Sequence, residues 1–353
     1  MVRRPPGRPS LATIATELGI STATVSNVFN RPERVTAELR DRVLAAAERQ
    51  GYAGPDPAAR QLSRGRTDTL GLLFTGELSY AFRDPAAVAF LEGLSLSCQT
   101  AELNLLMISA ESTSHRSSAV GNAVVDGFVV YSVAEADPHL KQILDRQLPT
   151  VVVDSPRNLP GVDWVGPDDR AGVRALGEVL LALGHRRIGA ITAGWHYAGP
   201  ADSYSRLHTD GGVLGERILG LRDALQQAGI TDLPVELRPA NTIADGAEAL
   251  HALLDRRPDL TAVCALMDVM ALGALDAARD RGLTVPRDLT ITGYDDIPRA
   301  AAAGLTTISQ PLVDKGRIAG ELYLSHRPGS PARRRTLPTR VLARSTSGPP
   351  RAD

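Results

Sequence analysis

The sequence has little cysteine, no long apolar run and no metal-binding signature. Its 353 residues include only two cysteines, Cys98 and Cys264, which stand far apart in apolar surroundings. We expect buried free thiols in a reducing compartment rather than a disulfide. The apolar runs fall well short of the ~20 residues of a membrane span. The seven histidines are scattered, with no H-x-x-x-H pair, and CxxC is missing. We therefore expect no disulfide, no membrane span, no metal and no cofactor.

Sequence motifs of secretion and of common enzymes are missing as well. The N-terminus is positively charged but has no apolar stretch behind it, so we expect a cytoplasmic, nucleoid-associated protein rather than a secreted one. There is no G-x-G-x-x-G after a strand, no G-x-x-x-x-G-K-[ST], no G-x-S-x-G and no H-E-x-x-H. An enzyme on a doubly wound fold remains a remote alternative.

The charge is unevenly distributed along the chain. Hydrophobic residues make up 43% and charged residues 22%, a globular balance, and the length exceeds one ordinary domain. The formal net charge is only −1, yet residues 1–66 hold eleven arginines, no lysine and six acidic residues. A small basic head on an acidic body indicates that only the head meets a polyanion.

Residues 1–52 have the pattern of three short helices behind a basic arm. An apolar stripe runs through 11–18 and ends at Gly19. Ser21 can cap a second helix over 22–29, and Thr36 a third over 37–50, packed through Leu39, Val43, Leu44 and Ala47. The tight turn between the first two helices predicts a helix-turn-helix. A small helical bundle with a polar surface is the alternative.

The second helix offers candidate DNA contacts. Thr22, Ala23 and Asn27 are the expected base readers, because an asparagine can pair with adenine and methyl groups suit thymine. The arm arginine Arg8 precedes the helices. We expect it to contact the DNA backbone or minor groove, and we expect phosphate contacts from Ser21, Thr24, Ser26, Asn30 and Arg31.

These segments resemble the head of the lactose-repressor (LacI/GalR-type) transcription regulators. The resemblance rests on Leu11-Ala-Thr-Ile-Ala, Gly19-Ile-Ser-Thr-Ala-Thr-Val-Ser-Asn-Val-Phe-Asn30, Val35-Thr36 and Gln50-Gly-Tyr52. The family's usual arginine late in the recognition helix is Asn27 here, so the operator sequence stays open.

Residues 53–67 form the expected hinge. The resemblance implies a short helix that folds on DNA, with Leu62 wedged into the minor groove and Ala59 and Arg60 beside it. A flexible linker is the alternative reading.

The body predicts two doubly wound α/β lobes that resemble periplasmic sugar-binding proteins. Strand-like runs alternate with helical stretches and are too numerous for one sheet. We expect an N-terminal lobe from 68–165 and 310–328, a C-terminal lobe from 166–309 and 329–346, and a frayed tail over 347–353. The expected strands are 70–74, 105–108, 127–130, 150–153, 188–193, 262–266 and 290–294, and the expected helices are 85–99, 139–146, 170–183, 215–228, 244–256 and 269–281.

The resemblance places an effector cleft between these lobes. It implies Arg217 and Asp295 as the main contacts, since a guanidinium and a carboxylate complement a diol or a base edge. Without the resemblance, Arg217 would be read as a solvated charge and Asp295 as a turn cap. Further candidates near the cleft are Asp268, Phe82, Asp84, Asp154 and Trp164.

Two departures leave the effector open. Met267 replaces the family's common asparagine, and 196–215 is a long polar stretch that is either a lid or a disordered insertion. We expect a homodimeric repressor of near-palindromic double-stranded operator DNA that responds to a carbohydrate. A nucleobase, a less polar ligand or no effector at all are the alternatives.

Overall fold

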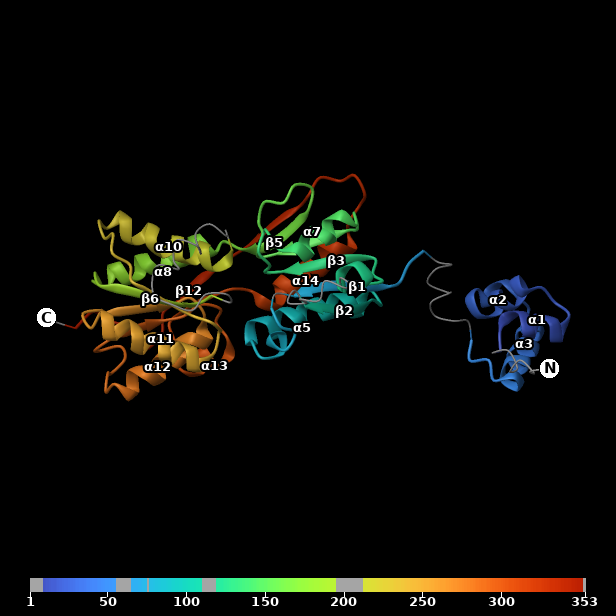
Figure 1. Cartoon of the computed structure of the whole chain (residues 1–353), viewed down its shortest axis with the longest axis horizontal. Coiled ribbons are helices and arrows are strands. Elements are labelled where there is room, and N and C mark those ends of the chain that lie inside the picture. The colour runs from blue at the N-terminus through green and yellow to red at the C-terminus, as the bar shows by residue number, and fades with distance from the viewer. Residues whose placement is uncertain (1–8, 55–64, 75, 110–118, 195–211, 352–353) are drawn as a thin grey trace, which may run out of the picture. The chain divides into compact units, whose positions relative to one another are not determined.

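The structure is a computed structural model that describes residues 9–54, 65–74, 76–109, 119–194 and 212–351. The chain divides into two compact units, Met1–Thr67 and Asp68–Asp353, called here the head and the body. Figure 1 labels many of their helices and strands. The helices of the described ranges are all too short or too polar to span a bilayer.

The head contains three helices around a small apolar core. They are α1 (Leu11–Leu18), α2 (Thr22–Asn30) and α3 (Ala37–Gln50), with a 3₁₀ turn η1 (Pro32–Arg34) before α3. Gly19 ends α1 with φ at 64°, a left-handed conformation that glycine adopts without strain. The side chains of Ile14, Val25 and Val43, one from each helix, are fully buried. Leu44, expected in this core, is 39% exposed instead.

The first lobe of the body is built on a six-stranded parallel sheet of order β11-β5-β4-β3-β1-β2. Helices α5 and α14 cover one face, and α6 and α7 cover the other. Glycines of α14 and α5 let the two backbones touch, since a Cβ at Gly316 would lie 2.0 Å from the Phe90 carbonyl oxygen. The elements are β1 (Thr69–Phe74), η2 (Tyr80–Phe82), α5 (Pro85–Thr100), β2 (Asn104–Ser109), α6 (Ala119–Asn122), β3 (Gly127–Tyr131), α7 (Pro138–Asp145), β4 (Thr150–Val153), β5 (Asp163–Pro167), α14 (Leu312–Leu324) and β11 (Arg334–Leu337).

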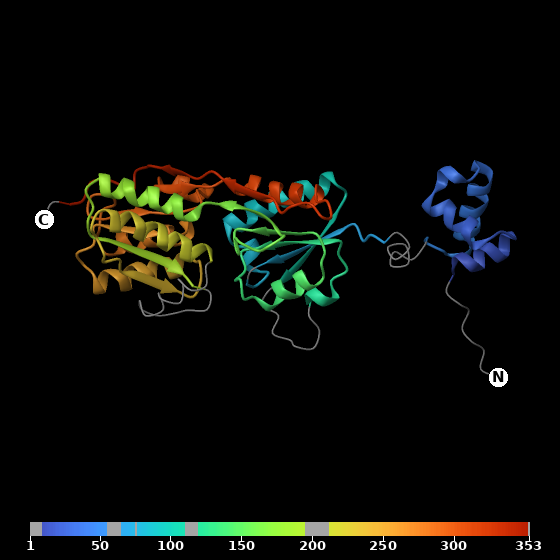
Figure 2. The same cartoon turned by 90° about the horizontal axis from the view of Figure 1, so that it is seen from above.

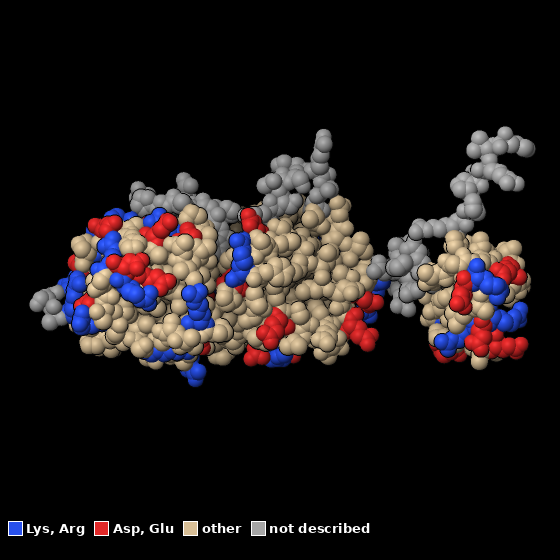
Figure 3. Space-filling view, turned by 90° about the horizontal axis from the view of Figure 1, so that it is seen from below, with Lys and Arg blue, Asp and Glu red and all other residues tan. Residues whose placement is uncertain are grey.

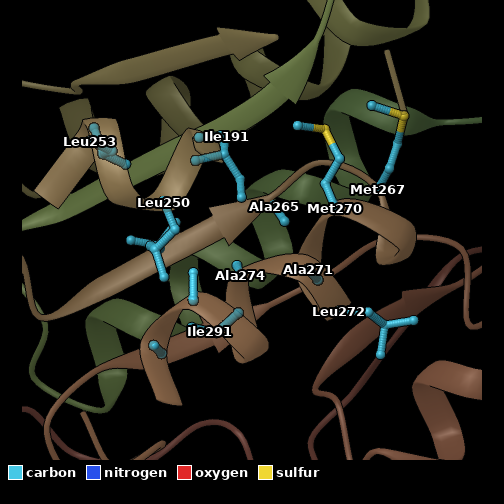
Figure 4. Close-up of a cluster of buried hydrophobic side chains, with 14 of the residues drawn as sticks. Ile191, Leu250, Leu253, Ala265, Met267, Met270, Ala271, Leu272, Ala274 and Ile291 are labelled. Carbon is cyan, nitrogen blue, oxygen red and sulfur yellow. The ribbon is translucent and has the colours of Figure 1, made fainter. Parts of the chain in front are cut away.

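The second lobe is built on a four-stranded parallel sheet of order β7-β6-β8-β9. Helices α8 and α10 lie on one face and α11 and α12 on the other (Figure 1). Figure 4 shows the second of these cores, where Ile191 and Ala265 of the sheet meet Leu250 and Met270 of the helices. The elements are α8 (Asp169–Ala182), β6 (Ile188–Ala193), α10 (Val213–Gln227), β7 (Val235–Arg238), α11 (Ile243–Arg256), β8 (Ala262–Ala265), α12 (Asp268–Asp280), β9 (Thr290–Thr292), α13 (Pro298–Ala302), β10 (Thr307–Ser309) and β12 (Arg340–Leu342).

The chain passes three times between the lobes, and the third passage differs from the expectation. The first follows β5 and the second lies at Gln310, between β10 and α14. The third was expected near Gly329, but β11 pairs in parallel with β5 in the first sheet. The chain therefore passes only after Leu337, and β12 then pairs antiparallel with β10. Figure 2 shows these segments together along one side of the body.

The tail is docked on the second lobe as far as Arg351, so the expectation of a frayed tail over 347–353 is wrong for 347–351, and 352–353 lie outside the described residues. The fully buried His185 ring donates from Nε2 to the Gly348 carbonyl at 2.8 Å, while Nδ1 lies 2.9 Å from Thr261 Oγ1. The Gly348 amide donates to Thr290 Oγ1 at 3.1 Å. A carbonyl accepts only, so Nε2 of the histidine carries a proton.

We expect this histidine to make stability depend on pH. Burial lowers the pKa of His185 below its ordinary value, so the unfolded chain takes up the proton more readily than the folded one. The stability that His185 contributes is thus present above pH of about 6.5 and is lost as the pH falls below it. Urea unfolding at pH 7.5 and 5.5 should show a smaller loss on acidification for His185→Gln than for the unchanged chain. His251→Gln, at the exposed Arg281 contact, is the matched control. An unchanged pH dependence in His185→Gln would contradict the assignment.

Candidate functional site

The head presents the N-terminal half of α2 on its surface. Ser21 caps the helix, because its hydroxyl accepts a hydrogen bond from the Thr24 amide at 3.0 Å. Thr22 and Ala23 are exposed and Asn27 is half-buried, while Val25 on the opposite face is fully buried. Within the described residues the Asn27 side chain has no hydrogen-bond partner, so its amide is available to a base edge.

The candidate phosphate contacts fall into two groups. Ser21 and Arg31 are exposed, and the Ser21 hydroxyl lies 2.8 Å from that of Thr24. Ser26 and Asn30 are half-buried and bonded to each other, with Asn30 Nδ2 donating to Ser26 Oγ at 3.1 Å. Arg8 and the hinge residues Ala59, Arg60 and Leu62 lie outside the described residues.

A cavity of about 220 Å³ lies between the two lobes of the body. The segments that form it follow the carboxyl ends of parallel strands, where open α/β sheets bind ligands. The first lobe contributes residues after β1, β3 and β4 and from α14, and the second lobe contributes residues after β6, β7, β8 and β9. The polar lining residues are Tyr80, Asp84, Tyr131, Ser132, Asp154, Ser155, Arg217, Asn241, Asp295, Gln310 and Lys315.

Lys315 and Asp154 form a buried ion pair on the first-lobe side of the cavity. The ammonium lies 2.8 Å from one carboxylate oxygen and 3.1 Å from the other, and it also donates to Gln310 Oε1 at 3.2 Å. Ser132 Oγ donates to the same carboxylate at 3.2 Å. Lys315 is 2% exposed and Asp154 is 6% exposed, so the pair must be satisfied internally.

Arg217 is the corresponding cation of the second lobe. Its Nε donates to Asp169 at 2.9 Å and its NH1 to the Leu266 carbonyl at 2.6 Å. Its NH2 lies 3.5 Å from Asp295 Oδ1, and the guanidinium stacks over the Tyr294 ring at 3.5 Å. These contacts hold the fork in one orientation at the cavity wall.

Gln310 joins the two ion pairs. Its Nε2 donates to Asp295 Oδ1 at 2.7 Å while its carbonyl accepts from Lys315. The amide stands where the chain passes from the second lobe back to the first. A continuous buried path of polar contacts therefore runs from Asp169 through Arg217, Asp295, Gln310 and Lys315 to Asp154. We call these six residues the interlobe polar path.

Asn241 makes a second contact between the lobes. Its Nδ2 lies 3.3 Å from the Tyr80 hydroxyl and donates to Asp84 Oδ1 at 3.4 Å. Asp84 also caps α5, accepting from the Ala87 amide at 3.2 Å. Burial raises the pKa of Asp84 above its ordinary value. The Asn241 carbonyl oxygen is buried and has no partner among the described residues.

The backbone is strained at two of the cavity carboxylates. Asp154 has φ of 63° and Asp295 has φ of 117°, and the latter is an uncommon conformation for any residue except glycine. Asp296, next in the chain, has φ of 60° and pairs with Arg344. Burial raises the pKa of Asp295, and Arg217 opposes that rise. Strain and buried charge of this kind concentrate at binding sites.

The structure brings four of the seven expected effector residues to the cavity, namely Asp84, Asp154, Arg217 and Asp295, and places three elsewhere. Asp268 is fully buried beneath the wall, where it accepts from Thr307 Oγ1 at 2.6 Å and from the Ile297 amide at 2.9 Å. Trp164 packs in the core of the first lobe. Phe82 is 66% exposed and is not among the described lining residues.

Sequence reasoning missed Asn241, Gln310 and Lys315 as cavity residues, although the last left a signal. Lys315 is one of only two lysines in the chain and falls between Leu312 and Ala319 on the apolar stripe of α14. Met267, noted as a departure, does line the cavity and also belongs to the core in Figure 4. The stretch 196–215 lies mostly outside the described residues.

Family models match both units of the chain. Residues 10–54 match the model of bacterial regulatory proteins of the lacI family, and residues 178–347 match a periplasmic binding protein-like domain. An HTH-type transcriptional regulator of Mycolicibacterium smegmatis is 42% identical over 98% of this chain and 98% of its own. The named relatives are transcriptional regulators and not enzymes.

Solved structures of two regulators share the fold. A LacI-family transcriptional regulator from Corynebacterium glutamicum aligns with a TM-score of 0.71 and 35% identity, over 97% of this chain and 99% of that one. The transcriptional regulator CelR in complex with cellobiose aligns with a TM-score of 0.69 and 29% identity, over 96% and 100%. Together with the helix-turn-helix head and the two-lobed body, these matches show that the chain belongs to the LacI family of DNA-binding transcriptional regulators.

Proposed function

We propose that this regulator is a homodimeric repressor of a near-palindromic operator and that a carbohydrate in the interlobe cavity changes its operator affinity. The observation that carries the proposal is the interlobe polar path. Four of its five charged groups line a cavity, and the path joins the lobes, so a ligand that contacts Arg217 or Asp295 acts directly on the interlobe connection. The cellobiose complex of CelR supports a carbohydrate ligand. The apolar side chain of Met267, which lines the cavity, can pack against the less polar face of a sugar ring.

The proposed dimer rests on the apolar surface of the first lobe. Val88 and Leu96 on α5 are 44% and 48% exposed, and Leu106 on the edge strand β2 is 38% exposed. Figure 3 shows a wide area of the first lobe almost free of charged side chains, whereas the second lobe carries many of both signs. Large exposed apolar areas mark protein interfaces. Two heads in a symmetric dimer then read two half-sites of a palindrome.

The proposed reading of DNA divides the head residues by role. Thr22, Ala23 and Asn27 contact base edges, and the contacts with phosphates come from Arg8, Ser21, Thr24, Ser26, Asn30 and Arg31. In the hinge, Leu62 enters the minor groove with Ala59 and Arg60 beside it. Because such a protein acts on chromosomal DNA, we propose that it works in the cytoplasm at the nucleoid.

Asn27→Ala should relax sequence preference at one base position in each half-site. A bidentate contact between asparagine and adenine contributes about 1–3 kcal/mol of discrimination, so the preferred base should lose its advantage there. The measurement is competition binding with a library of operator variants. Ser26→Ala is the matched control, since loss of a phosphate contact weakens binding to all sequences alike. An unchanged preference profile for Asn27→Ala would remove Asn27 as a reader.

Asp295→Asn should abolish the response to a carbohydrate while operator affinity stays within about twofold. The substitution keeps the size of the side chain and removes the charge that faces Arg217, and asparagine tolerates a positive φ. The ligand-induced change of operator affinity, about 5–150-fold in such regulators, should fall at least tenfold. The measurement is fluorescence anisotropy with labelled operator and a panel of sugars.

Asp296→Asn is the control for Asp295→Asn, because Asp296 also has a positive φ but pairs with Arg344 away from the cavity lining. A normal ligand response in Asp295→Asn, with reduced response in Asp296→Asn, would show that the effector assignment is misplaced.

A further inference from the structure

We propose that the cavity selects uncharged, hydroxyl-rich ligands and rejects their phosphorylated or carboxylated counterparts, with Asp84 and Asn241 as the residues that enforce the selection. The inference rests on the proposed function, because it names the charge class of ligand that the same cavity takes. It follows from the balance of donors and acceptors among the described lining residues.

The cations of the lining are already paired. Lys315 has two contacts with Asp154 and one with Gln310, which account for the three hydrogens of its ammonium. Arg217 donates to Asp169 and to the Leu266 carbonyl and faces Asp295 with its remaining NH2. A phosphate or carboxylate group would have to share Arg217 with the carboxylates of Asp169 and Asp295, and it could reach Lys315 only by breaking the pair with Asp154. Breaking a buried pair leaves its carboxylate uncompensated.

The acidic residues outnumber these cations. Three carboxylates line the cavity, Asp84, Asp154 and Asp295, against the two cations Arg217 and Lys315. Arg217 also shares its charge with a fourth carboxylate, Asp169, directly behind the wall. An anionic ligand therefore meets more carboxyl groups than cations in a site where little water screens their charge. A ligand hydroxyl group is favoured at the same carboxylates, because it can donate a hydrogen bond that a carboxylate readily accepts.

Asp84 is the lining carboxylate that forms no ion pair with a cation of the described chain, and Asn241 donates to it. A carboxylate only accepts, so the Asn241 amide nitrogen must face Asp84 and its carbonyl must point away from it. That carbonyl oxygen is buried without a partner in the described chain, and Asn241 itself is 8% exposed. A buried acceptor without a donor is costly, and a ligand hydroxyl supplies the donor. A phosphate oxygen at the same place would instead be a further acceptor beside the Asn241 carbonyl oxygen and the Asp84 carboxylate.

The test measures binding of matched pairs of ligands to the purified full-length protein by isothermal titration calorimetry at pH 7.5. The probes are glucose and glucose 6-phosphate, ribose and ribose 5-phosphate, galactose and galacturonate, with cellobiose and a panel of sugar alcohols as further neutral compounds. We expect at least one neutral compound to bind, and to bind at least 100-fold more tightly than its charged counterpart. A charged member that binds as tightly as its neutral partner, or more tightly, would overturn the selection while leaving the proposed function intact. Failure of every compound to bind would overturn both.

Variants identify the residues responsible. Asp84→Asn removes one charge and keeps the start of α5, because asparagine caps helices as well as aspartate does. It should reduce the preference for the neutral partner at least tenfold, mainly by admitting the charged one. Asn241→Leu should weaken binding of the neutral partner at least tenfold and weaken the charged partner by no more than that.

The matched control is Asp145→Asn, which removes an exposed carboxylate paired with Lys141 on the first lobe. It should bind both members of each pair as the unchanged protein does. An equal loss of preference in Asp145→Asn and Asp84→Asn would show that net charge, and not the cavity, sets the selection. That result would overturn the role given to Asp84.

Discussion

The organisation of the body depends on one buried contact, the ion pair between Lys315 and Asp154. The lysine reaches the cavity from α14, the helix that the chain enters on its return from the second lobe, and the aspartate ends the central strand β4. Because both groups are buried, neither tolerates loss of the other. Gln310 extends the pair to Asp295 and Arg217, so groups from both lobes share one set of hydrogen bonds. A ligand that competes for any member of this set alters the connection between the lobes. In this way a small cavity can govern the shape of a body of more than two hundred residues.

The sequence predicted the fold wherever an element has its own periodic apolar pattern. The three head helices and the strands such as 127–130 and 150–153 are confirmed within a residue or two, because their buried faces read directly from the spacing. The strand β11 was missed, since Arg334 and Arg335 give an exposed, charged edge strand no apolar alternation. The third passage between the lobes was misplaced for the same reason. The composition of the tail predicted that it would fray, but the His185 ring holds it by a hydrogen bond to the Gly348 carbonyl. Composition alone does not reveal such a contact between distant residues.

The candidate site was predicted in part. Asp154, Arg217 and Asp295 came from the family resemblance, and Asp84 came from its place at the start of the first body helix. All four lie at the cavity, although their roles remain proposals. Trp164 was selected as an aromatic residue near the expected cleft and Asp268 from its place beside Met267, and the structure places both in the protein interior. Asn241 could not be foreseen, since its contact with Asp84 joins residues 157 positions apart. Local pattern identifies which strand ends carry polar groups, whereas the partner of each group depends on how the two lobes meet.

The central claim is that the cavity and the DNA-reading head are thermodynamically coupled, and reciprocity tests it most directly. Operator affinity should be measured by fluorescence anisotropy with and without a saturating neutral sugar that binds, and the affinity for that sugar by calorimetry with and without operator. Linkage requires the same factor in both experiments, and we expect it to lie between about 5 and 150. A sugar that binds the cavity and leaves operator affinity unchanged, with its own affinity unaltered by operator, would contradict the account.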